Sequence, residues 1–286
     1  MALFIAPQPT IGEAWAKTLE GVAAAGGTAV HVVTTVTDPA GKDHDGYRAV
    51  ADKHLVERHI GKHHVQTVRT VASTIFPEAF YRSPGYFWTP EMKDTEQEVA
   101  LDAAATRLYE RYLQNLPSLR QFNKTGTYFQ RMIAWENKKG SAYNQLAVRI
   151  KKLRSDRGQN WSKSNAADIA VSGDGELEAA AGVQTFASTD ERSRGFPCLV
   201  HVDLTVRDHT LHVSAMYRHQ YLITKAYGNA VGLARLQRFI AEQTGYAVGE
   251  LTIFGTFSDT EPNIWKKQGV DQIVAEIQQV AHAEQP

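Results

Sequence analysis

The chain has a single cysteine among its 286 residues. One cysteine excludes an intrachain disulfide, and it also excludes the paired-cysteine motifs that hold structural zinc. Without such crosslinks the fold depends on its hydrophobic core, and a chain of this length can bury a large one. A lone thiol is typical of a protein from a reducing compartment.

Neither sign of charge is in excess, because 31 Lys and Arg stand against 31 Asp and Glu. This balance gives no electrostatic reason for general binding to nucleic acid or to an anionic membrane. No apolar run is long enough to span a bilayer. The apolar start, residues 1–7, lacks basic residues and ends at a proline. We therefore expect no secretory leader and a cytoplasmic protein.

Internal repeats and low-complexity tracts are also lacking, and the length allows one large domain or two ordinary ones. Residues 173–197 are rich in Gly, Ala and Ser and are the candidate boundary. The regular strands expected after this segment need partners from the rest of the chain. We therefore interpret the segment as a surface connection and predict a single domain over residues 1–286.

The first half of the chain alternates between predicted helices and strands. Helical spacing of apolar residues predicts helices over residues 11–25, 96–114 and 142–154. In the second of these, the positions expected to be buried are Val99, Leu101, Ala105, Leu108, Tyr112 and Leu113. β-Branched runs predict strands at residues 29–33 and near 65–71. The aromatic, proline-punctuated stretch 76–90 is expected to form an ordered loop or lid.

The second half has the clearest patterns. Alternating apolar and polar residues predict a hairpin of strands over 198–206 and 211–217, joined by a turn. A strand is expected at 251–257, and helices are expected at 229–243 and 268–282. These elements together predict an α+β fold, an extensive sheet with helices packed on one face.

Three residues of this half have side chains suited to chemistry. Cys198 opens the hairpin, and Arg218 lies near the end of its second strand, where a guanidinium can favour a thiolate or hold a phosphate. Asn229 begins the next helix, either as an N-cap or as an amide that reads the edge of a base. A lone cysteine is more often a small buried apolar residue. The three residues gain meaning from their combination.

In this combination, residues 196–255 resemble thymidylate synthase. As in that family, the Pro-Cys pair that ends at Cys198 starts a strand, and a Tyr-Arg pair that ends at Arg218 closes the next. Asn229 then opens a long amphipathic helix, and the Gly-acidic pair Gly249-Glu250 precedes the following strand. Without any gap, Cys198 falls on the family's nucleophile, Arg218 on a phosphate-binding arginine and Asn229 on the residue that reads the pyrimidine.

The resemblance continues more loosely upstream, where residues 126–131 and 143–146 resemble the family's Tyr-Gly-x-Arg and Asp-Gln-Leu segments. It implies a thymidylate synthase-like domain over residues 1–286, with a large mixed or antiparallel sheet. It also implies a homodimer in which the two subunits pair their sheets face to face.

The activity implied by the resemblance is transfer of a one-carbon unit, methyl or hydroxymethyl, from methylenetetrahydrofolate to C5 of a pyrimidine nucleotide. The Cys198 thiolate would add to C6 of the ring and make C5 nucleophilic. Asn229 would bond the amide edge of the ring, and Arg218 would hold the 5′-phosphate. The resemblance implies no metal, and it leaves uracil or cytosine open as the base.

The chain departs from the family at the sugar site. His219 stands at the motif serine and Tyr221 at the family aspartate, while Asp259 and Glu261 stand where a His and a Tyr hold the sugar hydroxyl. Acids there would accept a hydroxyl hydrogen bond but repel phosphate. We keep His219, Tyr221 and Asp259 as substrate-binding candidates and expect a modified nucleotide or specialised pathway.

Other features leave alternatives open. The catalytic glutamate of the family has no clear counterpart, and Glu96 and Glu98 are candidates by rough position only. If the general base is missing, the chain is a catalytically silent relative that binds a nucleotide. A histidine cluster, His54, His59, His63 and His64, has one pair at helical spacing, but Gly61 interrupts that helix. A solvated basic face is the preferred interpretation of this cluster.

Overall fold

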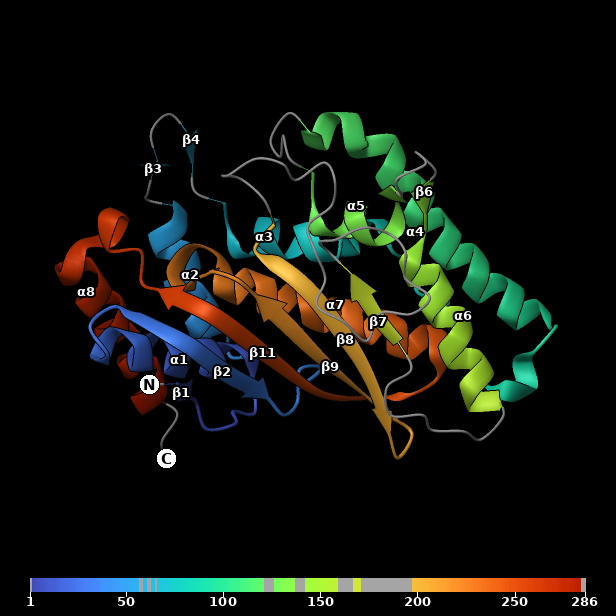
Figure 1. The fold of residues 1–286 in the computed structure, drawn as a ribbon, viewed down its shortest axis with the longest axis horizontal. Coiled ribbons are helices and arrows are strands. Elements are labelled where there is room, and N and C mark those ends of the chain that lie inside the picture. Colours follow the sequence, from blue (N-terminus) through green and yellow to red (C-terminus); the bar gives the residue numbers. More distant parts are fainter. Residues whose placement is uncertain are drawn as a thin grey trace. The chain divides into compact units, whose positions relative to one another are not determined.

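The computed structural model describes residues 2–56, 59–60, 63–64, 66–120, 126–136, 142–158, 167–170 and 197–283. For residues 59–60, 63–64, 136, 142 and 167–170 it describes the backbone alone. The fold class is α+β, as predicted, with a mixed open sheet and helices packed around it (Figure 1). Residues 173–196, considered above as a boundary, lie outside the described residues.

The helices are α1 (Ile11–Ala24), α2 (Asp45–Val56), α3 (Val68–Ile75), α4 (Glu96–Arg120), α5 (Tyr128–Ile133), α6 (Gln145–Gly158), α7 (Tyr227–Thr244) and α8 (Pro262–Ala283). Short helical turns are η1 (Glu78–Phe80), η2 (Pro90–Met92) and the π-helical η3 (Leu222–Ala226). Within the described ranges, none of the helices has both the length and the apolar character needed to cross a membrane.

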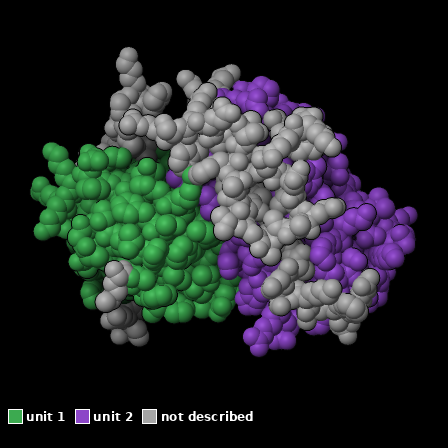
Figure 2. All heavy atoms as spheres, viewed as in Figure 1, with its two compact units in different colours: residues 1–73, 215–234, 249–286 green, residues 74–214, 235–248 purple. Residues whose placement is uncertain are grey.

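The strands are β1 (Leu3–Phe4), β2 (Thr28–Val36), β3 (His59–Ile60), β4 (His63–His64), β5 (Trp135–Glu136), β6 (Ala142–Tyr143), β7 (Ala167–Ala170), β8 (Leu199–Arg207), β9 (Thr210–Tyr217), β10 (Gln220–Tyr221) and β11 (Ala247–Asp259). The chain forms two compact units, each assembled from segments that are distant in sequence (Figure 2). Unit 1 comprises residues 1–73, 215–234 and 249–286, and unit 2 comprises residues 74–214 and 235–248.

In unit 1, β2 lies between β1 and β11. It pairs with β1 in parallel and with β11 in antiparallel register over residues 251–259. Helix α1 begins at a capping box, in which Thr10 and Glu13 bond each other's backbone N–H. The helix packs against β2 and buries Trp15, Leu19 and Val22. The short strand β10 pairs with the end of β11, opposite Ser258 and Asp259.

In unit 2, β7 pairs antiparallel with β8, and β8 and β9 form the predicted hairpin. The alternation predicted for the hairpin is confirmed, because Val202, Leu204 and Val206 are buried in β8. The centre of the unit is aromatic. Phe76 packs against Phe239 at a ring-centroid distance of 5.2 Å and edge-on against Phe129 at 5.8 Å. These rings supply much of the apolar area that holds α5 and α7 in place.

The strand predicted near residues 65–71 is wrong. Residue 65 lies outside the described residues, and the rest of that segment begins helix α3. Asp52 caps this helix by accepting the Val68 N–H at 2.9 Å. Val68, Val71, Ala72 and Ile75 are buried at helical spacing. The β-branched composition favoured a strand, but the burial of one helical face outweighed that local preference.

Two of the positions expected to be buried in α4 are exposed. The side chains of Val99 and Leu113 are 65% and 40% exposed, whereas Leu101, Ala105, Leu108 and Tyr112 are buried as predicted. The four buried residues follow one another at intervals of three or four, and Val99 and Leu113 fall off that stripe.

Gly245, which directly follows α7, tests how tightly this end of the helix is packed in unit 2. Its φ is +73°, and a Cβ added there would lie 1.8 Å from the Trp88 carbonyl oxygen. We expect Gly245→Ala to lower the free energy of unfolding by about 2–4 kcal/mol, because strain and overlap add. Urea denaturation measures the change.

Gly158→Ala, at the end of α6, is the matched control, since an added Cβ there meets no atom of the described residues within 4 Å. This substitution should change the unfolding free energy by less than about 1 kcal/mol. Equal losses in the two variants would contradict the packing described for Gly245.

Candidate functional site

Cys198 directly precedes β8 in unit 2 and is half-buried. Its neighbour is the phenol of Tyr128, whose oxygen accepts the Leu199 N–H at 3.5 Å. Desolvation raises the pKa of Tyr128 to about 12, the charge of the Cys198 thiolate adds to this effect, and N–H groups of Leu199 and Cys198 oppose it. The thiol therefore lies beside a protonated phenol instead of an entirely apolar surface.

Tyr128 is a candidate functional residue that the sequence analysis missed. It lies in the stretch 126–131, which resembles the family's Tyr-Gly-x-Arg segment, but no role was assigned to it. The N-cap Thr127 starts α5 by accepting the Gln130 N–H, and this cap places Tyr128 at the first position of the helix. Only the packing of α5 near the start of β8 reveals the contact with Cys198.

In unit 1, three of the predicted substrate-binding residues form one cluster. The His219 Nε2 lies 2.9 Å from the Asp259 Oδ2, and the imidazole stacks on the Tyr221 ring at 4.2 Å. Phe257 also contacts the imidazole, in an edge-on geometry at a ring-centroid distance of 5.0 Å. The parallel pairing of β10 with β11 sets Tyr221 opposite Asp259 and so creates this cluster. Arg218 directly precedes it in the chain.

Asn229 is the third residue of α7, so the N-cap interpretation is wrong. The helix begins at Tyr227 and continues directly from the π-helical turn η3. Asn229 is only 5% exposed. Its side-chain amide makes no hydrogen bond within the described part of the chain, which leaves the donor and acceptor available to a ligand.

Glu261 is excluded as a ligand-binding acid by its own contacts. It is 6% exposed, and its carboxylate accepts the N–H groups of Ile223 and Thr224 at 3.0 and 2.8 Å and the Thr224 hydroxyl at 2.6 Å. Its backbone has φ +57°, and its N–H donates to the Asp259 Oδ1 at 2.8 Å. Glu261 thus clamps η3, the turn that leads to Asn229.

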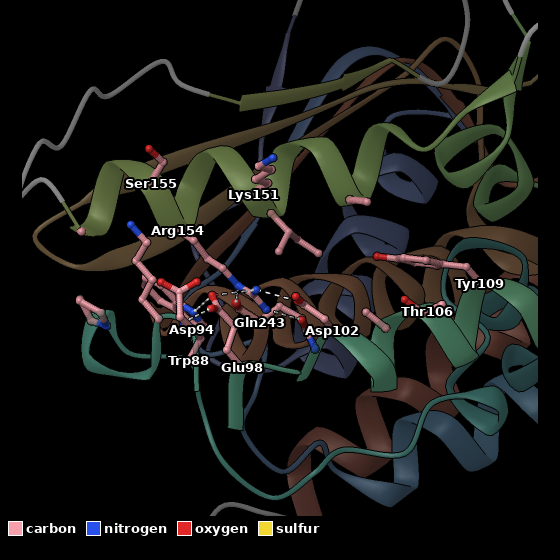
Figure 3. A pocket seen from close by; sticks show the side chains of 16 residues that line it. Trp88, Asp94, Glu98, Asp102, Thr106, Tyr109, Lys151, Arg154, Ser155 and Gln243 are labelled. Atoms are coloured by element: carbon pink, nitrogen blue, oxygen red, sulfur yellow. Dashed lines mark hydrogen bonds and ion pairs between the residues drawn. The ribbon is translucent and has the colours of Figure 1, made fainter. Parts of the chain in front are cut away.

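Unit 2 has a cavity of about 740 Å³ lined by α4, α6, the loop around Trp88 and the end of α7. Figure 3 shows Arg154 reaching from α6 to its centre. The guanidinium bonds Asp102 at 2.7 Å and Gln243 at 2.6 and 2.9 Å, and it covers the Trp88 ring at 5.6 Å. None of the predicted catalytic or substrate-binding residues lines this cavity.

Glu98, a candidate for the family's catalytic glutamate, is part of this cavity wall. It accepts the Trp88 Nε1–H and the Asp94 N–H, both at 2.8 Å. Burial acts to raise the pKa of Glu98, but these bonds and the Arg154 charge outweigh it and lower the pKa. A carboxylate with a lowered pKa accepts a proton less readily and is therefore a weaker general base. Glu96, the other candidate, is exposed.

The histidine cluster is described only in part. The His54 Nε2 lies 3.0 Å from the Glu276 Oε2, and Lys53 contacts the other oxygen of the same carboxylate at 3.0 Å. The side chains of His59, His63 and His64 lie outside the described residues. Where side chains are described, no group of three acids, histidines or cysteines is arranged to hold a metal ion.

Comparison with known proteins supports the resemblance at low identity. No protein-family model matches the chain. A protein of Methanococcoides burtonii named "Putative thymidylate synthase" is 22% identical over 152 residues, which are 53% of this chain and 59% of the relative. Proteins of the same name from Methanothermobacter thermautotrophicus and Methanothermobacter marburgensis are 38% identical over 64 residues, which are 22% of this chain and 29% of each relative.

The chain thus spans less than two thirds of the curated relatives that it matches. Their shared name supports a resemblance of this chain to a thymidylate synthase-like family.

The clamp on η3 predicts a pH dependence of stability. Burial raises the pKa of Glu261 above 4.5, its hydrogen bonds only partly oppose this, and the charge of Asp259 adds to it. The folded chain therefore holds this proton more tightly than the unfolded chain. The contribution of Glu261 to stability is fully present below pH 4.5 and is lost as the pH rises through the folded-state pKa.

Glutamine does not titrate, so we expect Glu261→Gln to lack this loss. Above pH 4.5 the unfolding free energy of wild type should therefore fall relative to that of the variant as the pH rises. Urea denaturation at a series of pH values gives the difference. The exposed Glu96→Gln is the control and should track the wild type. A Glu261→Gln curve parallel to wild type at every pH would refute the assignment.

Proposed function

We propose that the chain is an enzyme that transfers a one-carbon unit, methyl or hydroxymethyl, to C5 of a pyrimidine nucleotide. The observation that carries this proposal is the position of Cys198. The chain's lone thiol is half-buried just before β8 and lies beside the Tyr128 phenol. A thiol walled in by aliphatic side chains would not support covalent chemistry.

The proposed reaction uses Cys198 as a nucleophile. Its thiolate adds to C6 of the pyrimidine, and the electron pair displaced from the C5–C6 bond makes C5 nucleophilic. After C5 has bonded the one-carbon unit, a base would remove the C5 proton, and the amine of the donor would leave the transferred carbon as an exocyclic methylene forms on the ring. Hydride from the reduced folate would convert this methylene to methyl, whereas water would convert it to hydroxymethyl. The electron pair returned to C5 then restores the C5–C6 double bond and expels the Cys198 thiolate from C6.

Unit 1 supplies the proposed contacts to the nucleotide. The amide of Asn229 is buried and offers one acceptor and two donors, which match the amide edge of a pyrimidine. Arg218 carries the permanent charge suited to a 5′-phosphate. His219, Tyr221 and Asp259 form the adjacent cluster and are proposed to contact the sugar.

Methylenetetrahydrofolate, when bound, supplies the one-carbon unit in this proposal. The cavity of unit 2 is large enough for such a ligand, but the polar groups at its centre already satisfy one another. The Trp88 ring is covered by Arg154 and its N–H is bonded to Glu98. We therefore assign no folate contact to this cavity.

A catalytically silent nucleotide-binding protein is the second candidate. The contacts of Glu98, a candidate general base, favour this alternative. Its carboxylate accepts hydrogen bonds from Trp88 and Asp94, and its pKa is lowered. Such a protein would use Asn229 and Arg218 for binding and would not need the Cys198 thiol.

The proposed homodimer finds support in an apolar row on unit 1, formed by Phe4, Val33 and Phe254. Phe4 and Phe254 are the register partners of Val33 on its two neighbouring strands, so the three side chains share one face. Phe4 is 74% exposed. A large exposed apolar side chain in such a row is typical of an interface, and we propose that a second copy of the chain covers it.

A trapping experiment tests the enzymatic proposal. The probe is a 5-fluoropyrimidine nucleotide with methylenetetrahydrofolate. Fluorine takes the place of the C5 proton and cannot be removed by a base, so the covalent complex accumulates. We expect intact-mass spectrometry to show the chain plus both small molecules. Cys198→Ser should show no adduct and should still bind the nucleotide.

The silent-binder candidate predicts a different set of results. It predicts nucleotide binding without an adduct, no release of tritium from C5 of any pyrimidine nucleotide, and the same affinity in Cys198→Ser as in the wild type. That set would overturn the enzymatic proposal.

The dimer proposal predicts that a charge in the apolar row separates the subunits. We expect wild type to have twice the mass of one chain by light scattering after size exclusion, and Phe4→Glu to have the mass of one chain, because the carboxylate would be desolvated at the interface. Phe87→Glu, at an exposed aromatic residue of unit 2, should remain dimeric. A dimeric Phe4→Glu variant would exclude this face as the interface.

A further inference from the structure

The His219–Asp259 pair in unit 1 has the geometry of an oriented donor and acceptor. Asp259 holds one imidazole nitrogen at 2.9 Å, and rings on two sides restrain the imidazole: Tyr221 by stacking and Phe257 by an edge contact. The pair nevertheless remains accessible, since the His219 side chain is 31% exposed and that of Asp259 is 15% exposed.

Both side chains keep hydrogen-bonding capacity after these contacts. The Asp259 Oδ2 accepts from His219 and the Oδ1 accepts the Glu261 N–H at 2.8 Å. Each carboxylate oxygen has two lone pairs and can accept a second hydrogen bond. The other ring nitrogen of His219 has no hydrogen bond within the described residues, so it can donate or accept.

Asp259, which ends β11, and Glu261, two residues later, therefore differ in accessibility. Glu261 is buried and accepts three hydrogen bonds from η3, while Asp259 is partly exposed beside an imidazole. An accessible carboxylate next to an imidazole can bind two neighbouring hydroxyl groups. The carboxylate accepts a hydrogen bond from each hydroxyl, and the other ring nitrogen of the imidazole donates to or accepts from one of them. Carboxylates bind ribose hydroxyls in dinucleotide sites for the same reason. The same carboxylate repels a phosphate.

We propose that the His219–Asp259 pair binds the vicinal diol of a ribose, so that the nucleotide used by this chain is a ribonucleotide. This inference rests on the proposed function. Arg218 directly precedes the pair, and η3, clamped by Glu261, leads from it to Asn229. In this proposal Arg218 binds the phosphate, the His219–Asp259 pair binds the sugar and Asn229 binds the base, and all of these residues belong to unit 1.

A deoxyribonucleotide lacks one of the two hydroxyl groups and would leave part of the desolvated carboxylate without a partner. A site built to bond a hydroxyl discriminates strongly against the analogue that lacks it. The ribonucleotide should therefore bind at least about tenfold more tightly than the deoxyribonucleotide with the same base.

Isothermal titration calorimetry with UMP, dUMP, CMP and dCMP tests this inference. For the base that binds, we expect wild type to prefer the ribonucleotide at least about tenfold. Asp259→Asn and His219→Gln should bring the ratio close to one, because the ribonucleotide loses its contacts to both hydroxyl groups and the deoxyribonucleotide loses its contact to one. Asp208→Asn, at the exposed hairpin turn of β8 and β9, is the control and should keep the wild-type ratio.

The outcomes separate this inference from the proposed function. A deoxyribonucleotide that binds wild type as tightly as its ribonucleotide overturns the diol assignment and leaves the proposed function standing. A ribonucleotide preference that persists in both Asp259→Asn and His219→Gln shows that the pair is only structural and also overturns it. If no nucleotide of either sugar binds, the proposed function fails, and the inference fails with it.

Discussion

Three hydrogen bonds to the buried carboxylate of Glu261 fix the path of the chain between β10 and α7. The segment before this turn carries Arg218, His219 and Tyr221, and the segment after it carries Asn229. A buried acid is costly unless its oxygens are satisfied, and here every bond it accepts comes from η3. The acid therefore serves to hold two groups of proposed ligand-binding residues at a set spacing in unit 1.

Asp259 at the end of β11 and Glu261 just after it illustrate how alike residues take different roles. Asp259 orients His219 and remains accessible, whereas Glu261 is hidden beneath the turn that it clamps. In unit 2, the start of β8 sets the thiol of Cys198 beside Tyr128, so the proposed nucleophile and a phenol share one surface. Both arrangements arise at strand ends, where irregular backbone and polar side chains meet.

Much of the fold could be predicted from the sequence, because the hairpin of β8 and β9, α7 and α8 follow strict patterns of apolar residues. The segment before α3 could not, since β-branched residues suit a strand locally and only the buried face and the Asp52 cap select a helix. At the site, the nearness of His219, Tyr221 and Asp259 depends on the pairing of β10 with β11. The bonding of Glu261 to η3 and the contact of Tyr128 with Cys198 are tertiary and leave no periodic signal in the sequence.

We propose that Cys198 is a reactive thiol at a nucleotide site. Its reactivity is measured by the rate of alkylation by iodoacetamide in the native chain, with and without a pyrimidine nucleotide. We expect modification of the folded protein, slowed when the nucleotide is bound. A thiol that reacts only after unfolding, or at the same rate with and without nucleotide, would show that Cys198 does not act at such a site.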